Sequence, residues 1–307
     1  MKAVALGALA IAAGQRQIVA AGGMENMSAA PYLLGRARQG YRLGDGALLD
    51  AILSDALQDR SCGWHMGLTA ERLADEFGIS RADQDAFAVG SQQKASQAIR
   101  SGRFEAEIVD VAVPQRKGDP TVFDTDEFPR HDTTSAGLAA LKPAFKKDGS
   151  VTAGNASGIN DGAAALILMS AAEAKRRNIV PMAKILAYAS TALEPERMGL
   201  GPVAATQQAL EQAGLALADI ESIELNEAFA AQSLAVIKQL DADPALINPN
   251  GGAIALGHPV GASGARILVT LLYELTRAHK RLGLATLCVG GGQGMAIVVE
   301  AIDAFRK

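Results

Sequence analysis

Three residues with chemically useful side chains stand at the ends of predicted elements. Asn226 follows the apolar segment "IESIEL", His258 lies in the loop "GHPVG" before a helix, and Cys288 ends the apolar segment "GLATLC". Glycines 290–292 come shortly after Cys288, and their backbone N–H groups suit an anion-binding turn. A cysteine, a histidine and amide donors together suit thiolate chemistry on a carbonyl group, with an oxyanion hole to stabilise the intermediate.

Each of the three also has a purely structural interpretation, and the residues alone leave both open. Asn226 precedes a predicted helix and could be its N-cap. His258 could be a structural histidine, although its small neighbours offer little apolar cover. Cys288 could be a small buried hydrophobe, which is the commoner role of a free cysteine.

The glycine-rich loops raise the alternative of a dinucleotide-binding fold. No G-x-G-x-x-G follows a predicted strand, and "GHPVGASG" has a different spacing, so a Rossmann dehydrogenase is not predicted. The four histidines are scattered, and the sequence holds no pair of cysteines or of histidines at the C-x2–4-C or H-x3–5-H spacing of zinc sites. The sequence therefore predicts no metal site.

Composition limits the class of protein. With 307 residues, 49% of them hydrophobic, the chain can form two domains or one large one around a sizeable core. The 29 basic and 33 acidic residues give a net charge of −4, which favours neither nucleic acid nor an anionic membrane as a partner. No unbroken apolar stretch reaches the roughly 18 residues of a spanning helix. The two cysteines form no disulfide framework, so we expect a reducing, cytoplasmic location.

Apolar segments alternate with helical patterns, which predicts a layered α/β fold. The expected strands are 17–23, 163–170, 182–190, 220–225, 283–288 and 295–300, and the expected helices are 171–178, 202–213, 226–240 and 263–281. Ser80 and Asp83 resemble a capping box that begins a further helix, which reaches about Gly102. Residues 29–153 carry more charge and several prolines, so we expect them to form an insertion or a more exposed layer.

The opening segment "MKAVALGALAIAAG" has two interpretations. Lys2, the apolar run and the small residues near Ala12 fit a secretory signal peptide. The same apolar positions among alanines also fit a helix that is covered on all sides by the core.

Six stretches resemble the thiolase family, in particular its acetyl-CoA acetyltransferases. They are "GGMENMS", "WHMG", "TAGNASGINDGAA", "NEAFAAQ", "NGGAIALGHPVGASGAR" and "LCVGGGQG", in family order along the whole chain. The resemblance implies an αβαβα layered fold of two similar halves, here with the first half incomplete. It assigns residues 1–28 and 160–180 to the N-terminal domain, 29–159 to a loop domain that covers CoA, and 181–307 to the C-terminal domain.

The resemblance also implies catalytic roles. Cys288 matches the cysteine that takes the α proton in Claisen condensation, or protonates the carbanion in thiolysis of a 3-ketoacyl-CoA. His258 matches the histidine that activates the nucleophilic thiol, and with Asn226 holding a water it stabilises the thioester oxyanion. The N–H of Gly290 matches a donor of a second oxyanion hole.

Coenzyme A and acyl-CoA are the implied substrates, with no covalently bound cofactor. Ser157 matches a residue that contacts pantetheine. The positions that match the lining of the CoA tunnel are Leu57, His65, Met66, Arg130, Phe145, Ala153, Met198 and Phe229. Tetramers are usual in the family, so we expect a homo-oligomer.

The sequence departs from the family pattern at its nucleophile. Thiolases carry the nucleophilic cysteine in a C-G-S-G type turn a few positions before the residue that Lys2 matches. We therefore expect the opening segment to be the body of that helix, which disfavours the signal peptide. Cys62 is not expected to replace the thiol, because no helix N-terminus would lower its pKa.

Three functional hypotheses follow from this departure. The chain is an acetyl-CoA C-acetyltransferase whose coding frame begins further upstream, or it is a non-catalytic fragment that binds CoA. A decarboxylating condensing enzyme is less favoured, because "NEAF", "GHP" and "CVGGG" match thiolases better.

Overall fold

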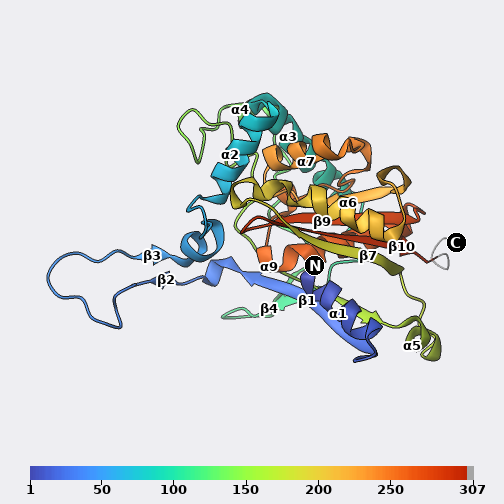
Figure 1. Ribbon diagram of the computed structural model, residues 1–307. Helices are drawn as coiled ribbons and strands as arrows, with labels where there is room; N and C mark the ends of the chain where they lie inside the picture. The colour runs from blue at the N-terminus through green and yellow to red at the C-terminus, as the bar shows by residue number, and fades with distance from the viewer. Residues whose placement is uncertain (303–307) are drawn as a thin grey trace.

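The computed structural model describes residues 1–302, and its largest element is a four-stranded sheet (Figure 1). The sheet order is β7 (Ala183–Ala192), β10 (Gln293–Ala301), β9 (Leu282–Val289) and β8 (Ser222–Leu225). β10 pairs antiparallel with both β7 and β9, whereas β8 runs parallel to β9. The carboxyl end of β8 therefore lies beside the carboxyl end of β9, which brings Asn226 toward Cys288.

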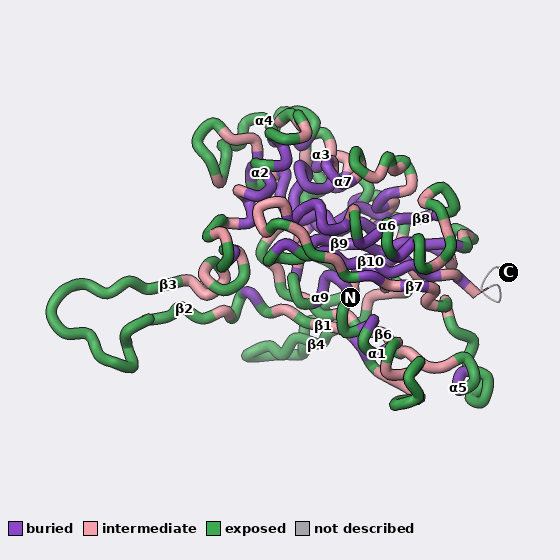
Figure 2. The backbone as a smooth tube through the Cα atoms, in the orientation of Figure 1, coloured by how far each residue is buried: buried purple, intermediate pink, exposed green. Residues whose placement is uncertain are grey.

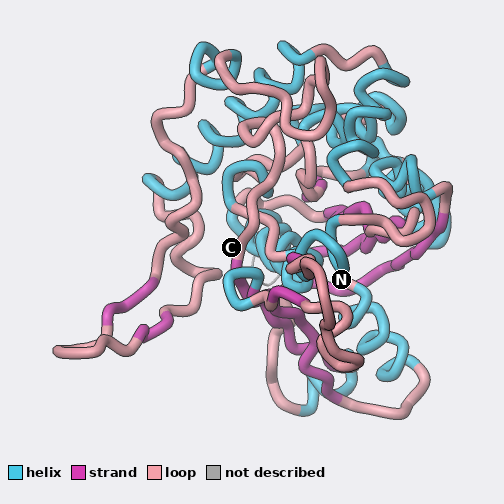
Figure 3. Tube along the Cα trace, turned by 90° about the vertical axis from the view of Figure 1, so that its left-hand side faces the viewer, coloured by secondary structure: helices cyan, strands magenta, loops and turns pink. Residues whose placement is uncertain are grey.

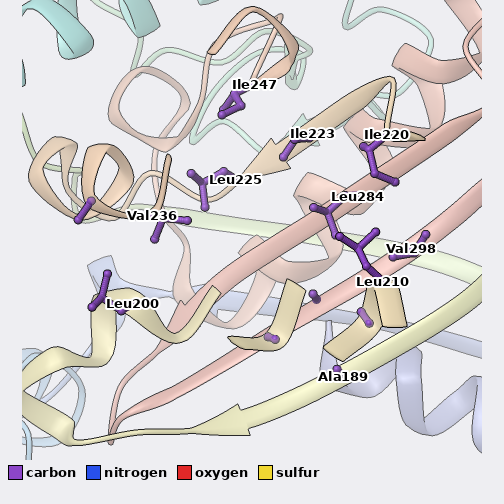
Figure 4. Packing of buried hydrophobic residues seen from close by; sticks show 14 of the residues in the cluster. Ala189, Leu200, Leu210, Ile220, Ile223, Leu225, Val236, Ile247, Leu284 and Val298 are labelled. Atoms are coloured by element: carbon purple, nitrogen blue, oxygen red, sulfur yellow. The ribbon is translucent and has the colours of Figure 1, made fainter. Parts of the chain in front are cut away.

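Helix α6 (Gly201–Ala213) covers one face of this sheet, and α7 (Ala230–Leu240) lies beside α6. α6 ends as predicted, because Gly214 adopts the left-handed conformation (φ 66°) that terminates a helix. The buried side chains between the helices and the sheet form one core (Figure 4). Its members include Leu210, Leu284 and Val298.

Two helices lie on the other face of the sheet, and a second, smaller sheet covers them. α1 (Lys2–Ala12) and α9 (Val260–Arg277) are this middle layer, and both pack on the antiparallel pair of β1 (Ile18–Asn26) and β6 (Asp161–Met169). The order is therefore α6 and α7, large sheet, α1 and α9, small sheet. The layered α/β fold predicted from the sequence is confirmed.

Two details differ from the sequence-based expectation. α1 is not covered on all sides, since Val4 is fully buried whereas Leu6 and Leu9 are about half exposed. β6 alternates between exposed and half-buried positions instead of being buried throughout, because only one of its faces packs against helices.

Residues 27–160 connect β1 to β6; in Figure 1 they form the arm on the left, several of the helices at the top, and a short segment lower down near β1. The elements of this segment are η1 (Met27–Ala29), β2 (Tyr32–Leu33), β3 (Leu49–Asp50), η2 (Ile52–Leu57), α2 (Met66–Phe77), α3 (Arg81–Arg100), β4 (Val111–Val113), β5 (Thr121–Phe123) and α4 (Ser135–Ala139). The capping box of Ser80 and Asp83 is present at the start of α3, as predicted. The arm around β2 and β3 extends away from the body and is mostly exposed (Figure 2).

Short elements complete the chain. They are α5 (Ala171–Arg176), η3 (Pro195–Leu200), η4 (Leu217–Asp219), η5 (Pro244–Leu246) and α8 (Ala253–Leu256). The view in Figure 3, turned by 90°, shows that most of the helices lie above the small sheet. No helix within residues 1–302 is both long and apolar enough to cross a membrane.

The predicted domain boundaries stay predictions. The boundaries at 28/29 and 159/160 fall just after β1 and just before β6. These two strands pair with each other, so the small sheet joins the two ends of the intervening segment. Residues 303–307 of the predicted C-terminal domain lie outside the described residues.

Candidate functional site

Cys288 is the penultimate residue of β9 and is 7% exposed. It packs in an apolar cluster with Met66, Met198 and Phe229. Burial in this cluster raises the pKa of the Cys288 thiol to about 12, because the charged form loses its hydration. At neutral pH the group is therefore a protonated thiol. It can donate a proton, and it must lose that proton before it can act as a base.

The turn at residues 290–292 follows Cys288 and is held from two sides. Gly291 and Gly292 have φ values of 82° and 77°, a backbone conformation that residues with a side chain rarely adopt. The N–H of Gly291 donates to a carboxylate oxygen of Asp59 at 3.0 Å, and the carbonyl of Gly292 accepts from the N–H of Leu193 at 2.7 Å. Within residues 1–302, no acceptor takes the N–H of Gly290, so that donor is available to a ligand.

His258 is oriented by the residues around its loop. Its Nδ1 lies 2.6 Å from Oγ of Ser263, and Oγ lies 2.9 Å from the carbonyl of Pro259, to which it donates. The backbone N–H of His258 donates to Oδ1 of Asn160 at 2.9 Å. Gly257 has a φ of 94°, and a Cβ there would lie 2.6 Å from the Asn160 side chain, so only glycine fits.

The surroundings keep His258 neutral. Burial lowers its pKa to about 4, and the nearby Arg266 guanidinium adds to the effect. A neutral imidazole whose Nδ1 carries the hydrogen has a lone pair on Nε2. Nε2 of His258 faces Nδ2 of Asn226 at 3.4 Å, so the basic nitrogen points into the site.

Asn226 is fully buried at the carboxyl end of β8, where its N–H donates to the carbonyl of Thr286 at 3.0 Å. Its Oδ1 has no hydrogen-bond partner among the described residues. A buried amide oxygen without a partner is costly, so this atom suits a water or ligand donor. The N-cap interpretation is wrong, because the residue at the N-cap of α7 is Phe229.

The segment 155–160 packs against the chain just after Asn226. Both the N–H and the hydroxyl of Ser157 donate to the carbonyl of Ala228 at 3.0 Å. Ala156 and Phe229 form an isolated β-bridge. These contacts place Ser157 next to the Asn226 loop, as a pantetheine contact would require.

Aromatic side chains form a wall beside Cys288. The ring of His65 stacks on Phe145 with centroids 4.7 Å apart, and Phe145 meets the edge of Phe229 at 6.1 Å. The Nδ1 atom of His65 accepts from the N–H of Gly67, which fixes the ring at the start of α2. Burial lowers the pKa of His65, so the wall is uncharged near neutral pH.

The structure brings together most of the predicted site. Five of the residues that the sequence identified share the apolar cluster, fully or at its edge: Met66, Phe145, Met198, Phe229 and Cys288. Leu57 is half-buried in η2, and Ala153 and the Arg130 side chain are exposed, so these three stand outside that cluster. Their predicted contacts with CoA stay predictions.

Sequence reasoning missed three residues around the site. Ser263 is five positions after His258 in the same motif, a spacing that could have suggested a contact. Asp59 begins "DRSCG", a pattern typical of an Asx-turn, but its contact with Gly291 crosses most of the chain. Arg266 faces Glu224 at 3.7 Å, and nothing local in the sequence indicates it. Within residues 1–302, no group of His, Cys, Asp and Glu side chains could hold a metal ion.

Two family models match the chain. The model described as "Thiolase, N-terminal domain" matches residues 1–172, and "Thiolase, C-terminal domain" matches residues 179–301. An acetyl-CoA acetyltransferase of Escherichia coli (strain K12) is 60% identical over 304 residues, which cover 99% of this chain and 77% of that protein.

Solved structures agree with these matches. The crystal structure of the Bacillus anthracis acetyl-CoA acetyltransferase has a TM-score of 0.96 and 46% identity, and the match covers 98% of this chain and 76% of that one. Human mitochondrial 3-ketoacyl-CoA thiolase in complex with CoA has a TM-score of 0.94 and 42% identity, with 98% and 75% covered.

Proposed function

The chain belongs to the thiolase family, and from this premise we propose that it is an acetyl-CoA C-acetyltransferase that acts on CoA thioesters. The observation that carries the proposal is the meeting of three groups at one place. Asn226 and His258 face each other there, and the buried Cys288 thiol lies at the end of the strand beside them.

His258 acts on the nucleophilic thiol. Since its Nδ1 hydrogen is held by Ser263, Nε2 takes the proton of a thiol that attacks the acyl carbonyl. The Nε2–H formed in this way then donates to the oxyanion, together with a water held by Asn226. The family resemblance implies that the thiol that holds the acyl group stands a few positions before Lys2. Met1 packs against α9 beside Gly264, next to Ser263, so the start of α1 lies on the side of the His258 loop.

Cys288 transfers the proton at the α carbon of the substrate. In thiolysis the bond between the α and β carbons of the 3-ketoacyl-CoA breaks, and the thiol proton of Cys288 goes to the departing carbanion. In condensation the Cys288 thiolate takes the α proton of acetyl-CoA instead. The neutral imidazole and the protonated thiol of the free protein are the two groups that thiolysis needs at its start.

The aromatic wall and the 155–160 segment receive the pantetheine arm of CoA. Ser157 supplies a polar contact at the Asn226 loop, and His65, Met66 and Phe145 supply an apolar surface. An uncharged wall suits the methylene groups of a pantetheine chain, which gain from burial, while the two amides of the chain hydrogen-bond to polar groups or water.

A homo-oligomer and a cytoplasmic location belong to the same proposal. The arm around β2 and β3 exposes several large apolar side chains, an arrangement typical of a surface that a second copy covers. These side chains are Tyr32, Leu33, Leu34, Tyr41, Leu43, Leu48 and Leu49. Both cysteines are free thiols, which suits a reducing compartment.

A thiolysis assay with acetoacetyl-CoA and CoA tests the proposal, on the 307-residue chain beside a chain extended with upstream coding sequence. Loss of the enolate absorbance only with the extended chain supports the mechanism as written. Activity of the 307-residue chain would mean that another thiol, Cys62 first, holds the acyl group. CoA binding without turnover by either chain would refute the enzyme and favour the non-catalytic alternative.

A further inference from the structure

Asp59 connects the segment that precedes α2 with the glycine turn after Cys288. Asp59 is 3% exposed, although it lies in a connecting segment between exposed neighbours. One of its carboxylate oxygens, Oδ2, accepts from the N–H of Gly291 at 3.0 Å. The other, Oδ1, accepts from the N–H groups of Ser61 and Cys62 at 2.7 and 3.1 Å.

The two carboxylate oxygens of Asp59 therefore stabilise different parts of the structure. The Oδ1 contacts close a local turn, which two further backbone bonds complete: Asp59 N–H to the carbonyl of Trp64, and Gly63 N–H to the carbonyl of Asp59. The Oδ2 contact crosses 232 residues of sequence and is the only one of the set that touches the 290–292 turn. Three donors outweigh the cost of burying the carboxylate and hold the pKa of Asp59 below its usual value, so it stays charged.

The same segment meets the turn at a second point. A Cβ added to Gly290 would lie 3.2 Å from Cε of Met66, the first residue of α2. Residues 59–66 thus contact Gly290 through Met66 and Gly291 through Asp59. The N–H of Gly290, the free donor of the turn, immediately precedes these two contacts along the chain.

We propose that Asp59 is a positioning residue for the oxyanion hole: its Oδ2 holds the 290–292 turn, and the segment that covers CoA thereby sets the position of the Gly290 N–H. This rests on the proposed function, in which Gly290 donates to the oxyanion. A donor must lie within a few tenths of an ångström of its place to stabilise a transition state. Loss of Oδ2 therefore lowers kcat while the apolar wall still binds CoA.

Asp59→Ser isolates this contact. A serine hydroxyl can still accept from the amides of Ser61 and Cys62, as in an ST-turn, but it has no second oxygen for Gly291. Asp55→Ser is the matched control, because Asp55 lies four residues earlier on the surface, where its carboxylate accepts from the exposed Arg60 and from the neighbouring Ser54 hydroxyl. Backbone hydrogen exchange of the peptide that contains Gly291 reports the contact, and steady-state thiolysis reports its consequence.

We expect Asp59→Ser to speed exchange at Gly291 at least about tenfold and to lower kcat about 10- to 100-fold, with KM for CoA within about twofold of the parent. Asp55→Ser should match the parent in every measurement. Unchanged exchange and kcat would overturn the proposal. A raised KM with unchanged kcat would overturn it as well, since Asp59 would then serve only the CoA-covering segment.

Two precautions keep the test decisive. If Asp59→Ser does not fold, Asp59→Asn replaces it, because its one oxygen serves the local turn and its NH2 group then faces the N–H of Gly291. The exchange measurement needs no turnover. In every kinetic test the parent is the chain extended with upstream coding sequence. An inactive extended parent would refute the proposed function, while exchange would still decide whether Asp59 holds the turn.

Discussion

The hydroxyl of Ser263 lies between Nδ1 of His258, at 2.6 Å, and the carbonyl of Pro259, at 2.9 Å. When the hydroxyl donates to the carbonyl, its oxygen accepts from Nδ1. In this arrangement Nδ1 carries the hydrogen and Nε2 is the free base. One buried hydroxyl, 1% exposed, thus selects the tautomer that the proposed reaction needs.

Ser263→Ala should slow the reaction without unfolding the protein. The imidazole loses its only acceptor at Nδ1, so part of the population carries the hydrogen on Nε2 and cannot take a proton there. A general base contributes about 10²–10⁴-fold to a rate, and we expect kcat for thiolysis to fall by at least ~10-fold. Steady-state kinetics at saturating CoA measures this loss.

Ser222→Ala is the control for that change. Ser222 begins β8, is fully buried, and its hydroxyl has no partner among residues 1–302. Removal of an unpaired buried hydroxyl costs little, so the activity and melting temperature should stay close to those of the parent. Equal activity of both variants would contradict the role of Ser263.

The stability of the protein should depend on pH through His258. In the unfolded chain its pKa is near 6.5, whereas burial lowers it to about 4 in the folded protein. Between these values the unfolded state binds a proton that the folded state does not. The free energy of unfolding therefore falls as the pH drops from 6.5 toward 4, by about 1.4 kcal/mol for each pH unit.

Urea unfolding at pH 7, 6 and 5 measures this loss, with His258→Asn as the reference that lacks the titrating group. The difference between parent and variant should shrink steadily as the pH falls. Replacement of Arg266 by methionine removes a neighbouring cation, so the pKa of His258 should rise. The loss should still begin near pH 6.5, but it should end at a higher pH and be smaller in total. A constant difference across the range would show that His258 does not titrate as proposed.

The sequence predicted most elements because their signals are local. The capping box of Ser80 with Asp83 and the left-handed Gly214 need only a few neighbouring residues, and both are present. Asn226 as an N-cap failed for a tertiary reason. Phe229 is extended and forms a β-bridge with Ala156, so α7 begins only at Ala230.

The site could be predicted only in part. Asn226, His258 and Cys288 can be identified from local sequence, since each stands at an element end within a distinctive motif. The residues that orient them cannot be identified in this way. Arg266 acts on His258 through space, and Asp59 reaches Gly291 across 232 residues. Such contacts depend on how the helices and sheets pack, which no local pattern reports.

Cys288→Ala and Cys62→Ala should differ sharply. Cys288 is the only thiol in the apolar cluster beside the site, so its loss should abolish exchange of the α protons of acetyl-CoA with solvent deuterium. Cys62 contributes its backbone N–H to Asp59, and alanine keeps that donor. We expect Cys62→Ala to exchange protons at the rate of the parent.

Proton NMR of acetyl-CoA in deuterated buffer follows the methyl signal directly and does not require a nucleophilic thiol. Circular dichroism of both variants checks that the fold is intact. Exchange that survives Cys288→Ala, or disappears with Cys62→Ala, would reverse the assignment of the two thiols.

Gly67→Ala should weaken CoA binding through the aromatic wall. A Cβ at Gly67 would lie 2.3 Å from the ring of Phe145, which stacks on His65, so the ring must move. We expect KM for CoA to rise about tenfold, equivalent to about 1.4 kcal/mol, with a smaller change in kcat.

Gly90→Ala is the control in α3, where a Cβ meets nothing within 4 Å. That variant should bind CoA like the parent and gain up to about 1 kcal/mol of stability, because alanine favours a helix over glycine. Equal KM values for the two variants would mean that Phe145 does not line the CoA site.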